Sequence, residues 1–326
     1  MGRMVEGQWR SDTWVRDNEG RFERDPTTFR DRISHQKGAQ FPPATGRYHL
    51  YVSLACPWAH RTLISRALMG LENAIDVSVV HPYMLEEGWT FAQDFEGTTG
   101  DKILNKEYMR QIYKEADSNY TGRVTVPVLW DTETETIVNN ESREIIRMFS
   151  TSFRELATEN VDLWPEGYRE RIDEIIDAIY EPVNNGVYRS GFATTQKAYE
   201  EAVQELFEAL KRWEDHLSKN RYLAGDVFTE ADLCMFTTLL RFDPVYYGHF
   251  KCNLKHVYEM PNLWAYTREI YQMPGVAETC NLGHIQSHYY YSHERINPSR
   301  VVPKGPILDR LADHQRDRLP GKVVRR

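Results

Sequence analysis

The spacing of apolar residues changes from that of a strand to that of a helix near residue 55. Residues 48–53 alternate polar and apolar positions and are rich in β-forming side chains, which predicts a strand. Between residues 57 and 71, apolar side chains recur at helical spacing, which predicts a helix. A short apolar strand follows over residues 76–81. Because β-α-β units have right-handed crossovers, we expect these two strands to pair in parallel.

A long polar segment over residues 82–122 interrupts this pattern, and helical spacing returns within it only between residues 104 and 117. The segment is too long for an ordinary loop in a compact domain, and such segments usually have a functional role. We therefore interpret residues 82–122 as an insert in the domain that surrounds it.

Two strands and a helix follow the insert. Residues 124–130 and 135–138 predict a hairpin, although Pro127 cannot donate a hydrogen bond to a strand ladder. A cis peptide bond between Val126 and Pro127, at the start of the strand, would explain this proline. Residues 139–142 (NNES) are a helix N-terminus signature and precede a short apolar helix. The order β-α-β, insert, β-β-α is the layout of a thioredoxin-like domain.

Strand patterns stop near Leu163, and the following residues have helical spacing. The expected helices cover residues 166–186, 197–219, 229–241 and 261–272. Thr229 and Asp232 form a capping-box pattern at the start of the third helix. We therefore expect an α/β thioredoxin-like N-terminal domain plus an all-α C-terminal domain.

The chain is expected to divide into three parts. Residues 1–45 would be an extended N-terminal arm, residues 46–155 the thioredoxin-like domain with its insert, and residues 156–326 an all-helical domain with a C-terminal tail. The arm is polar, and its scattered aromatic side chains would pin it to a domain surface. These aromatic residues are Trp9, Trp14, Phe22, Phe29 and Phe41. The basic residues 322–326 are expected to be a solvated end of the tail.

Composition and charge exclude several classes of partner. The 326 residues are 41% hydrophobic and 27% charged, which is typical of a soluble protein of two domains. The net charge of −8 argues against general binding to nucleic acid or anionic membranes. No apolar run has the length of a membrane span, and residues 1–12 lack the apolar core of a signal peptide. The spacing of the four cysteines is typical neither of zinc sites nor of disulfide frameworks, so we expect the reducing cytoplasm.

A cysteine at the junction of the first strand and helix is the best candidate for chemistry. Pro57 suits a first helical turn, which places Cys56 at or just before the N-cap, near the positive end of the helix dipole. A helix N-terminus can lower a thiol pKa from about 8.5 to roughly 3.5–7.5. The alternative is a small buried hydrophobic residue. Since Ala59 stands where a C-x-x-C motif would place its second sulfur, a mixed disulfide at Cys56 needs an external thiol for its resolution.

Five segments, taken together and in order, resemble one family. They are Cys56–Arg61 (CPWAHR), Arg123–Trp130 (RVTVPVLW), Asn140–Ser142 (NES), Arg241–Tyr246 (RFDPVY) and His288–His293 (HYYYSH). They are similar to segments of the glutathionyl-hydroquinone reductases, the xi class of glutathione transferases. The resemblance covers nearly the whole chain, from about Trp9 to Pro306.

The resemblance implies a glutathione-dependent reduction of glutathionyl-hydroquinones to hydroquinones, with glutathione as co-substrate and no metal. The Cys56 thiolate would attack the glutathione sulfur and release the hydroquinone. A second glutathione would then resolve the mixed disulfide at Cys56 as oxidised glutathione. The first step needs a general acid, because a proton must reach an aromatic carbon. Tyr188 matches this acid, and Tyr246 and Tyr289 match tyrosines that would hydrogen-bond the thiolate and lower its pKa. The alternative for each tyrosine is a packed aromatic residue.

The glutathione-binding residues that the resemblance implies are Trp89, Arg123, Thr125, Val126, Glu141 and Ser142. The main chain of Val126 would face the cysteinyl unit of glutathione, in the manner of an added strand. Glu141 would pair with the γ-glutamyl ammonium group, and Ser142 with the adjoining carboxylate at a helix N-terminus. The arginine would pair with a carboxylate, and the tryptophan would cover the peptide. The structural alternatives are a helix cap for the Asn140–Ser142 corner, a solvated charge for Arg123 and a loop contact for Trp89.

Two other functions fit the same scaffold. An omega-like thioltransferase or dehydroascorbate reductase also uses a cysteine. A non-catalytic interaction module needs none, and the presence of Cys56, Arg123 and Glu141–Ser142 disfavours the module. The three histidines His284, His288 and His293 suggest a metal site, but no cysteine or carboxylate completes a ligand set. A homodimer is expected from the resemblance and from the apolar stretch 245–250, which would form an interface if it is exposed.

Overall fold

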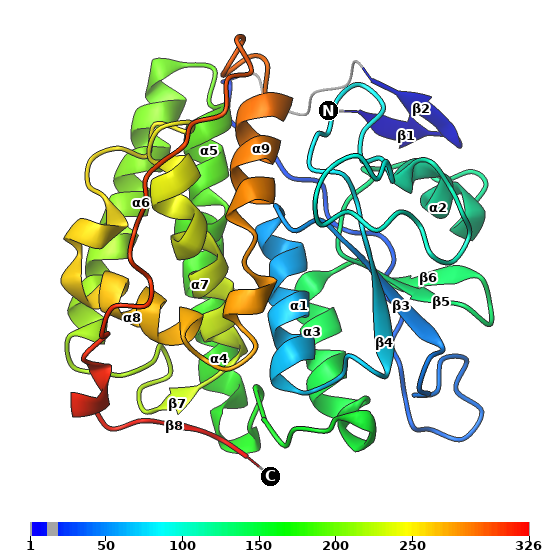
Figure 1. Cartoon of the computed structure of the whole chain (residues 1–326), viewed down its shortest axis with the longest axis horizontal. Coiled ribbons are helices and arrows are strands. Elements are labelled where there is room, and N and C mark those ends of the chain that lie inside the picture. The colour runs from blue at the N-terminus through cyan, green and yellow to red at the C-terminus, as the bar shows by residue number, and fades with distance from the viewer. Residues whose placement is uncertain (1, 12–18, 326) are drawn as a thin grey trace. The chain divides into compact units, whose positions relative to one another are not determined.

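The structure, a computed structural model, describes residues 2–11 and 19–325. These residues form two compact units, whose helices and strands are labelled in Figure 1. The first unit contains residues 2–11, 24–160 and 279–292, and the second contains residues 19–23, 161–278 and 293–325.

A four-stranded sheet lies at the centre of the first unit. β3 (Tyr48–Val52) pairs in parallel with β4 (Ile75–Val79) and antiparallel with β5 (Val128–Asp131). β5 in turn pairs antiparallel with β6 (Thr136–Asn139), so the strand order is β4-β3-β5-β6. Every residue of β3 is buried, as expected for a central strand.

Two helices pack together in this unit and complete the predicted layout. α1 (Pro57–Leu68) connects β3 to β4, and α3 (Ser142–Thr151) follows β6 and packs against α1. The predicted orders β-α-β and β-β-α are thus confirmed. The peptide bond between Val126 and Pro127 is cis, as the position of this proline predicted.

The insert is mostly irregular, and its helix α2 (Met109–Ala116) is shorter than the predicted stretch of residues 104–117. The insert contacts α9 (Leu282–Ser292), a helix that comes late in the sequence but belongs to the first unit. His284 Nε2 lies 2.6 Å from the carbonyl oxygen of Glu96, and the rings of Tyr83 and Tyr291 stack at 3.9 Å. The sequence analysis assigned residues 279–292 to the helical domain. Contacts between α9 and the insert join segments that lie far apart in the chain, and such contacts leave no local sequence pattern.

The N-terminal arm contributes a hairpin and an extended strip to the first unit. β1 (Arg3–Val5) pairs antiparallel with β2 (Gln8–Arg10). Farther along, Arg30 donates two hydrogen bonds to the Glu144 carboxylate on α3, at 2.7 and 2.8 Å. These hydrogen bonds lower the pKa of Glu144 to about 2. Of the predicted pinning residues, Trp14 lies outside the described residues and Phe22 lies in the second unit.

The regular structure of the second unit is mainly helical. Its helices are α4 (Arg169–Ile179), α5 (Gly186–Phe192), α6 (Gln196–Leu217), α7 (Glu230–Arg241) and α8 (Pro261–Tyr271). Every residue of α7 is buried, and the predicted capping box at its start is confirmed by a 2.8 Å hydrogen bond from the Thr229 N–H to Asp232 Oδ2. No helix in the described part of the chain is long and apolar enough to cross a membrane.

The prediction of one continuous helix over residues 166–186 is wrong, because this stretch is interrupted. A π-helical turn, Tyr180–Asn184, separates α4 from α5, and it contains Pro182, which has no N–H for a regular helix. A second π-helical turn, Phe242–Tyr246, follows α7 and likewise contains a proline. Short 3₁₀ turns lie at Arg154–Leu156, Glu166–Tyr168, Val257–Glu259, Ala277–Thr279 and Arg316–Arg318.

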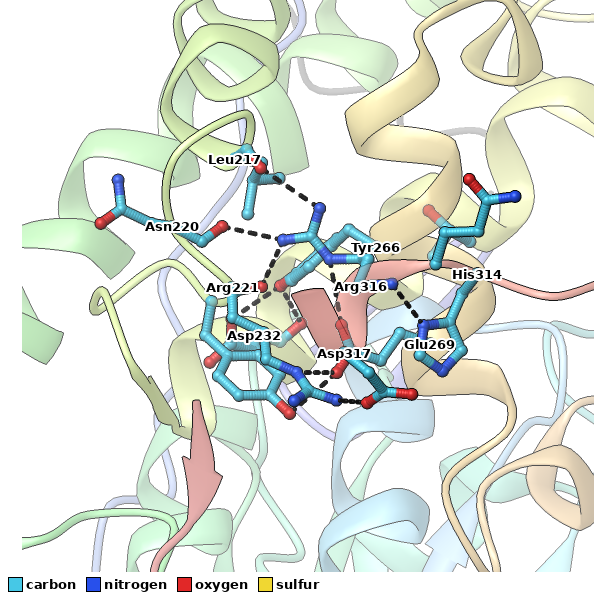
Figure 2. A network of polar contacts seen from close by, with 12 residues as sticks. Leu217, Asn220, Arg221, Asp232, Tyr266, Glu269, His314, Arg316 and Asp317 are labelled. Atoms are coloured by element: carbon cyan, nitrogen blue, oxygen red, sulfur yellow. Dashed lines mark hydrogen bonds and ion pairs between the residues drawn. The ribbon is translucent and has the colours of Figure 1, made fainter. Parts of the chain in front are cut away.

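The C-terminal residues are attached to the second unit through their main chain, while the basic side chains of Lys322 and Arg325 are exposed, as the sequence predicted. β8 (Lys322–Val323) pairs in parallel with β7 (Val227–Phe228). Figure 2 shows a second attachment, the buried guanidinium of Arg316. It donates to Glu269 at 3.0 Å and to the carbonyl oxygens of Leu217, Asn220 and Arg221. The sequence did not reveal the main-chain pairing that holds this segment.

Candidate active site

Cys56 is the N-cap residue of α1, as the position of Pro57 predicted. Its side chain makes no capping hydrogen bond to the helix. Instead, its Sγ lies 3.5 Å from the carbonyl oxygen of Val126, the residue before Pro127. The side chain is half-buried and is not part of a disulfide. The thiol thus lies at the positive end of a helix and donates a hydrogen bond to a main-chain carbonyl.

The segment of residues 123–126 carries three predicted binding residues. Val126 is buried, and Thr125 is held by the phenol of Tyr113, whose oxygen lies 2.9 Å from the Thr125 carbonyl oxygen. Arg123 is half-buried, and its pKa is lowered to about 10. The causes are the desolvation of the guanidinium, followed by the positive charge of Arg24. An anion bound here would relieve this repulsion.

The corner of residues 139–142 brings Glu141 and Ser142 to the start of α3. Glu141 is the N-cap residue, and its Oε1 accepts a hydrogen bond from the Arg143 N–H at 3.2 Å. The Ser142 hydroxyl donates to the same carboxylate at 3.4 Å. It also lies 3.5 Å from a guanidinium nitrogen of Arg61, which is buried. The predicted helix cap is therefore present, and it combines a carboxylate with a hydroxyl and a neighbouring cation.

Trp89 and Tyr289 both contact His288 of α9. Trp89, in the insert, is buried and stacks on the ring of His288 at 4.8 Å. The same histidine makes an edge-to-face contact with Tyr289 at 5.1 Å, and its Nδ1 lies 2.8 Å from the carbonyl oxygen of Pro82. His284 and His288 thus contact main-chain oxygens of the insert. Within residues 2–11 and 19–325, no group of three His, Cys, Asp or Glu side chains is arranged to hold a metal ion.

Tyr188 and Tyr246 lie in the second unit, within a cluster of aromatic rings. The ring of Tyr188 lies 5.9 Å from that of Tyr246 and 5.4 Å from that of Phe250. Phe22, from the N-terminal arm, stacks on Tyr188 at 6.4 Å. The structure brings these two tyrosines together, whereas Cys56 and the other predicted site residues lie in the first unit. Their pairing with the thiol therefore stays a prediction.

The apolar stretch 245–250 is largely buried, so the argument that it forms an exposed interface is wrong. Tyr246 and Phe250 have no exposed surface, and their rings stack at 5.5 Å. These two aromatic rings pack in the interior of the second unit. The large apolar side chains that are exposed lie elsewhere, and the most exposed of them are Leu254, Val301, Ile307 and Leu311.

Sequence reasoning missed three residues of the site. Arg61 approaches Ser142, and Arg24 from the arm lies over the ring of Trp58, 3.9 Å from its centroid. Tyr113 holds the segment before Pro127. Arg61 and Trp58 lie in the motif CPWAHR, which could have marked them as site residues. Nothing in the local sequence distinguished Arg24 or Tyr113 from other polar or aromatic residues.

Two protein-family models match the chain. The model described as "Glutathione S-transferase, N-terminal domain" matches residues 55–152. The model described as "Glutathione S-transferase, C-terminal domain" matches residues 196–269. Both agree with the observed units, and the predicted fold class, a thioredoxin-like domain plus an all-α domain, is confirmed.

Comparison with similar proteins identifies the class of glutathione transferase to which the chain is related. The glutathionyl-hydroquinone reductase YqjG of Escherichia coli is 51% identical over 97% of this chain and 99% of its own length. The glutathionyl-hydroquinone reductase PcpF of Sphingobium chlorophenolicum is 47% identical over 94% of this chain and 96% of its own. A solved xi-class glutathione transferase from Natrialba magadii has a TM-score of 0.94 and 56% identity, covering 99% of this chain and 98% of its own.

The glutathione-bound structure of YqjG has a TM-score of 0.89 and 48% identity, covering 97% of this chain and 99% of its own. Identity at this level over nearly the whole of each chain establishes the family. The chain belongs to the glutathionyl-hydroquinone reductases, the xi class of glutathione transferases.

Proposed function

We propose that this protein reduces glutathionyl-hydroquinones to hydroquinones, with glutathione as co-substrate and Cys56 as nucleophile. The observation that carries the proposal is the position of the Cys56 thiol. It lies at the N-terminus of α1, 3.5 Å from the carbonyl oxygen of Val126, in a chain half identical to a glutathionyl-hydroquinone reductase. The helix N-terminus favours the thiolate, which is the attacking species in thiol exchange.

In the first step, the Cys56 thiolate attacks the glutathione sulfur of the conjugate. A sulfur–sulfur bond forms, and the bond between that sulfur and the ring carbon breaks. The electron pair of the broken bond takes a proton, which gives the hydroquinone and leaves glutathione on Cys56. A general acid must supply this proton. Tyr188 is assigned this role, and its place among aromatic rings suits a planar substrate.

In the second step, the thiolate of a second glutathione attacks the mixed disulfide and leaves as oxidised glutathione, which returns Cys56 to the thiolate. An external thiol is needed because Ala59 occupies the place of a second motif cysteine. Cys234 and Cys252 are buried, and burial raises the pKa of the Cys252 thiol. Tyr246 and Tyr289 are assigned hydrogen bonds to the Cys56 thiolate, which would stabilise the charged form.

Glutathione has two carboxylates and one ammonium group, and the first unit offers a partner for each. Glu141 is assigned the ammonium group, and Ser142 with the N–H groups of α3 the neighbouring carboxylate. The cationic region of Arg123 and Arg24 suits the other carboxylate. The remaining assigned residues are Thr125 and Val126, which pair with the peptide main chain, and Trp89, which covers it.

Two further proposals concern the state of the protein. All four cysteines are thiols, which suits the reducing cytoplasm. We propose a homodimer, supported by the family and by exposed apolar side chains such as Ile307 and Leu311 near the C-terminus. Light scattering at micromolar concentration should give about twice the chain mass of 38.3 kDa, and a value near 38.3 kDa would contradict the dimer.

The function is tested by incubating the protein with glutathionyl-menadione and glutathione. The wild-type protein should release the hydroquinone and one oxidised glutathione per turnover. Cys56→Ser should abolish both products at an unchanged melting temperature, and the matched control Cys280→Ser, at another half-buried thiol, should keep them. Turnover by Cys56→Ser equal to that of the wild type would overturn the mechanism.

A further inference from the structure

One buried hydroxyl group joins the insert to two segments of the proposed glutathione site. Tyr113 lies on α2 and has no exposed surface. Its phenol donates to the carbonyl oxygen of Thr125 at 2.9 Å and lies 3.2 Å from the Thr125 hydroxyl. The side-chain amide of Asn140 donates to the same phenol oxygen at 3.1 Å. Segments that are fifteen positions apart in the chain thus meet at one atom of the insert.

Each of these segments continues directly into a proposed glutathione contact. Thr125 precedes Val126, whose carbonyl oxygen lies 3.5 Å from the Cys56 thiol. Asn140 precedes Glu141, the N-cap of α3. Asn140 is held in place from the other side as well, because its Oδ1 accepts a hydrogen bond from the Phe29 N–H at 3.2 Å.

The phenol acts both as a donor and as an acceptor of hydrogen bonds. Burial raises the pKa of Tyr113, so the group is protonated at neutral pH and can donate to Thr125. Its oxygen accepts from Asn140 and, at 3.3 Å, from the Thr125 N–H. Removal of this oxygen would leave polar groups of both segments without their partner.

We propose that Tyr113 is a positioning residue, which fixes the separation between the Val126 segment and the Glu141–Ser142 corner for glutathione. The inference rests on the proposed function, since it concerns the same site. Glutathione would contact Val126 through its cysteinyl unit and Glu141 through its γ-glutamyl group. A ligand that bridges two segments binds more tightly when their spacing is preset, because less ordering is needed on binding. Through Tyr113, the insert thereby holds the two segments of the binding site at a fixed spacing.

The test is Tyr113→Phe, which removes the hydroxyl and keeps the ring that packs edge-to-face on Phe29 at 5.8 Å. The KM for glutathione should rise about tenfold, which corresponds to about 1.4 kcal/mol, while kcat changes less than about twofold. The rate constant is spared because no group that touches the reacting sulfur has changed. Calorimetric titration of glutathione into Cys56→Ser proteins, with and without Tyr113→Phe, should show the same loss of affinity.

The matched control is Tyr51→Phe. Tyr51 is also buried in the first unit, and its hydroxyl donates one hydrogen bond, to Asp101 at 2.9 Å, outside the proposed site. This variant should keep the wild-type affinity for glutathione. Equal weakening by Tyr51→Phe would mean that any lost buried hydroxyl loosens the unit, and would overturn the proposal. So would an unchanged affinity in Tyr113→Phe.

A second variant, Thr125→Val, keeps the branched shape and removes the hydroxyl that faces Tyr113. Because both changes act on one hydrogen-bonded group, the double variant should bind glutathione within about twofold of Tyr113→Phe alone. Fully additive losses would contradict a shared role. The proposed function is judged separately: a wild-type protein inactive on glutathionyl-menadione would refute that function, whereas the affinities of the variants for glutathione still decide the role of Tyr113.

Discussion

Replacement of Glu141 by glutamine separates two roles that its carboxylate combines. As the N-cap of α3, Oε1 accepts a hydrogen bond from the Arg143 N–H at 3.2 Å. As a negative charge, the same carboxylate is proposed to bind the ammonium group of glutathione. The side chain of Gln still offers a carbonyl oxygen to the helix but has no charge. Glu141→Gln should therefore weaken glutathione binding and leave the fold as stable as before.

The size of the effect follows from the exposure of the site. A hydrogen bond to a charged group contributes about 1.5–3 kcal/mol. Glu141 is half-buried, so solvent screens part of the interaction and the lower end of this range applies. About 1.5 kcal/mol corresponds to roughly a tenfold rise in the KM for glutathione. Glu141→Ala would also remove the cap, which costs about 1 kcal/mol of stability, and would mix the two effects.

The assay is steady-state turnover of glutathionyl-menadione at varied glutathione, with the melting temperature measured in parallel. Glu144→Gln is the matched control, because Glu144 lies one turn farther along α3 and its carboxylate is bound by Arg30 and Asn139. The control should keep the wild-type KM. An unaltered KM in Glu141→Gln would refute the reasoning and leave this carboxylate as a helix cap alone.

The remaining predictions concern the acid and the arm. Tyr188→Phe should lower kcat on glutathionyl-menadione by about 10²–10⁴. The same variant should keep most of its activity on a small mixed disulfide of glutathione, whose leaving thiolate needs no carbon protonation; equal loss on both substrates would refute the role as acid. The depressed pKa of Glu144, mainly due to its hydrogen bond with Arg30, implies stability that is present above about pH 4.5 and lost as the pH falls through about 2. Wild-type and Glu144→Gln melting temperatures should therefore converge over that interval, and a constant difference would contradict this linkage.

Local patterns predicted the parts of the molecule in which neighbouring residues interact. The strand before Cys56, the helix beginning at Pro57 and the capping box of Thr229 and Asp232 depend on residues within a few positions of one another. The cis bond at Pro127 was predictable because a proline there conflicts with a regular ladder.

Features that depend on distant partners left no such signal. α9 joins the first unit through contacts with the insert nearly two hundred positions earlier, such as that of His284 with Glu96 at a separation of 188 residues. The basic side chains of Lys322 and Arg325 are exposed, as predicted, but the main-chain pairing of Lys322 and Val323 with β7 had no local signal. Tyr113 resembled any other aromatic residue in the insert. Its role follows from its partners Thr125 and Asn140, which come from other segments.

The central claim is that the Cys56 sulfur receives glutathione from the substrate, and peptide mass spectrometry after a single turnover tests it most directly. The protein is mixed with glutathionyl-menadione in the absence of glutathione, quenched with acid, digested and analysed. The account predicts the mass of one glutathione on the peptide of Cys56, released hydroquinone in equal amount, and no adduct on Cys234, Cys252 or Cys280. Hydroquinone release without an adduct on Cys56, or with the adduct on another cysteine, would contradict it.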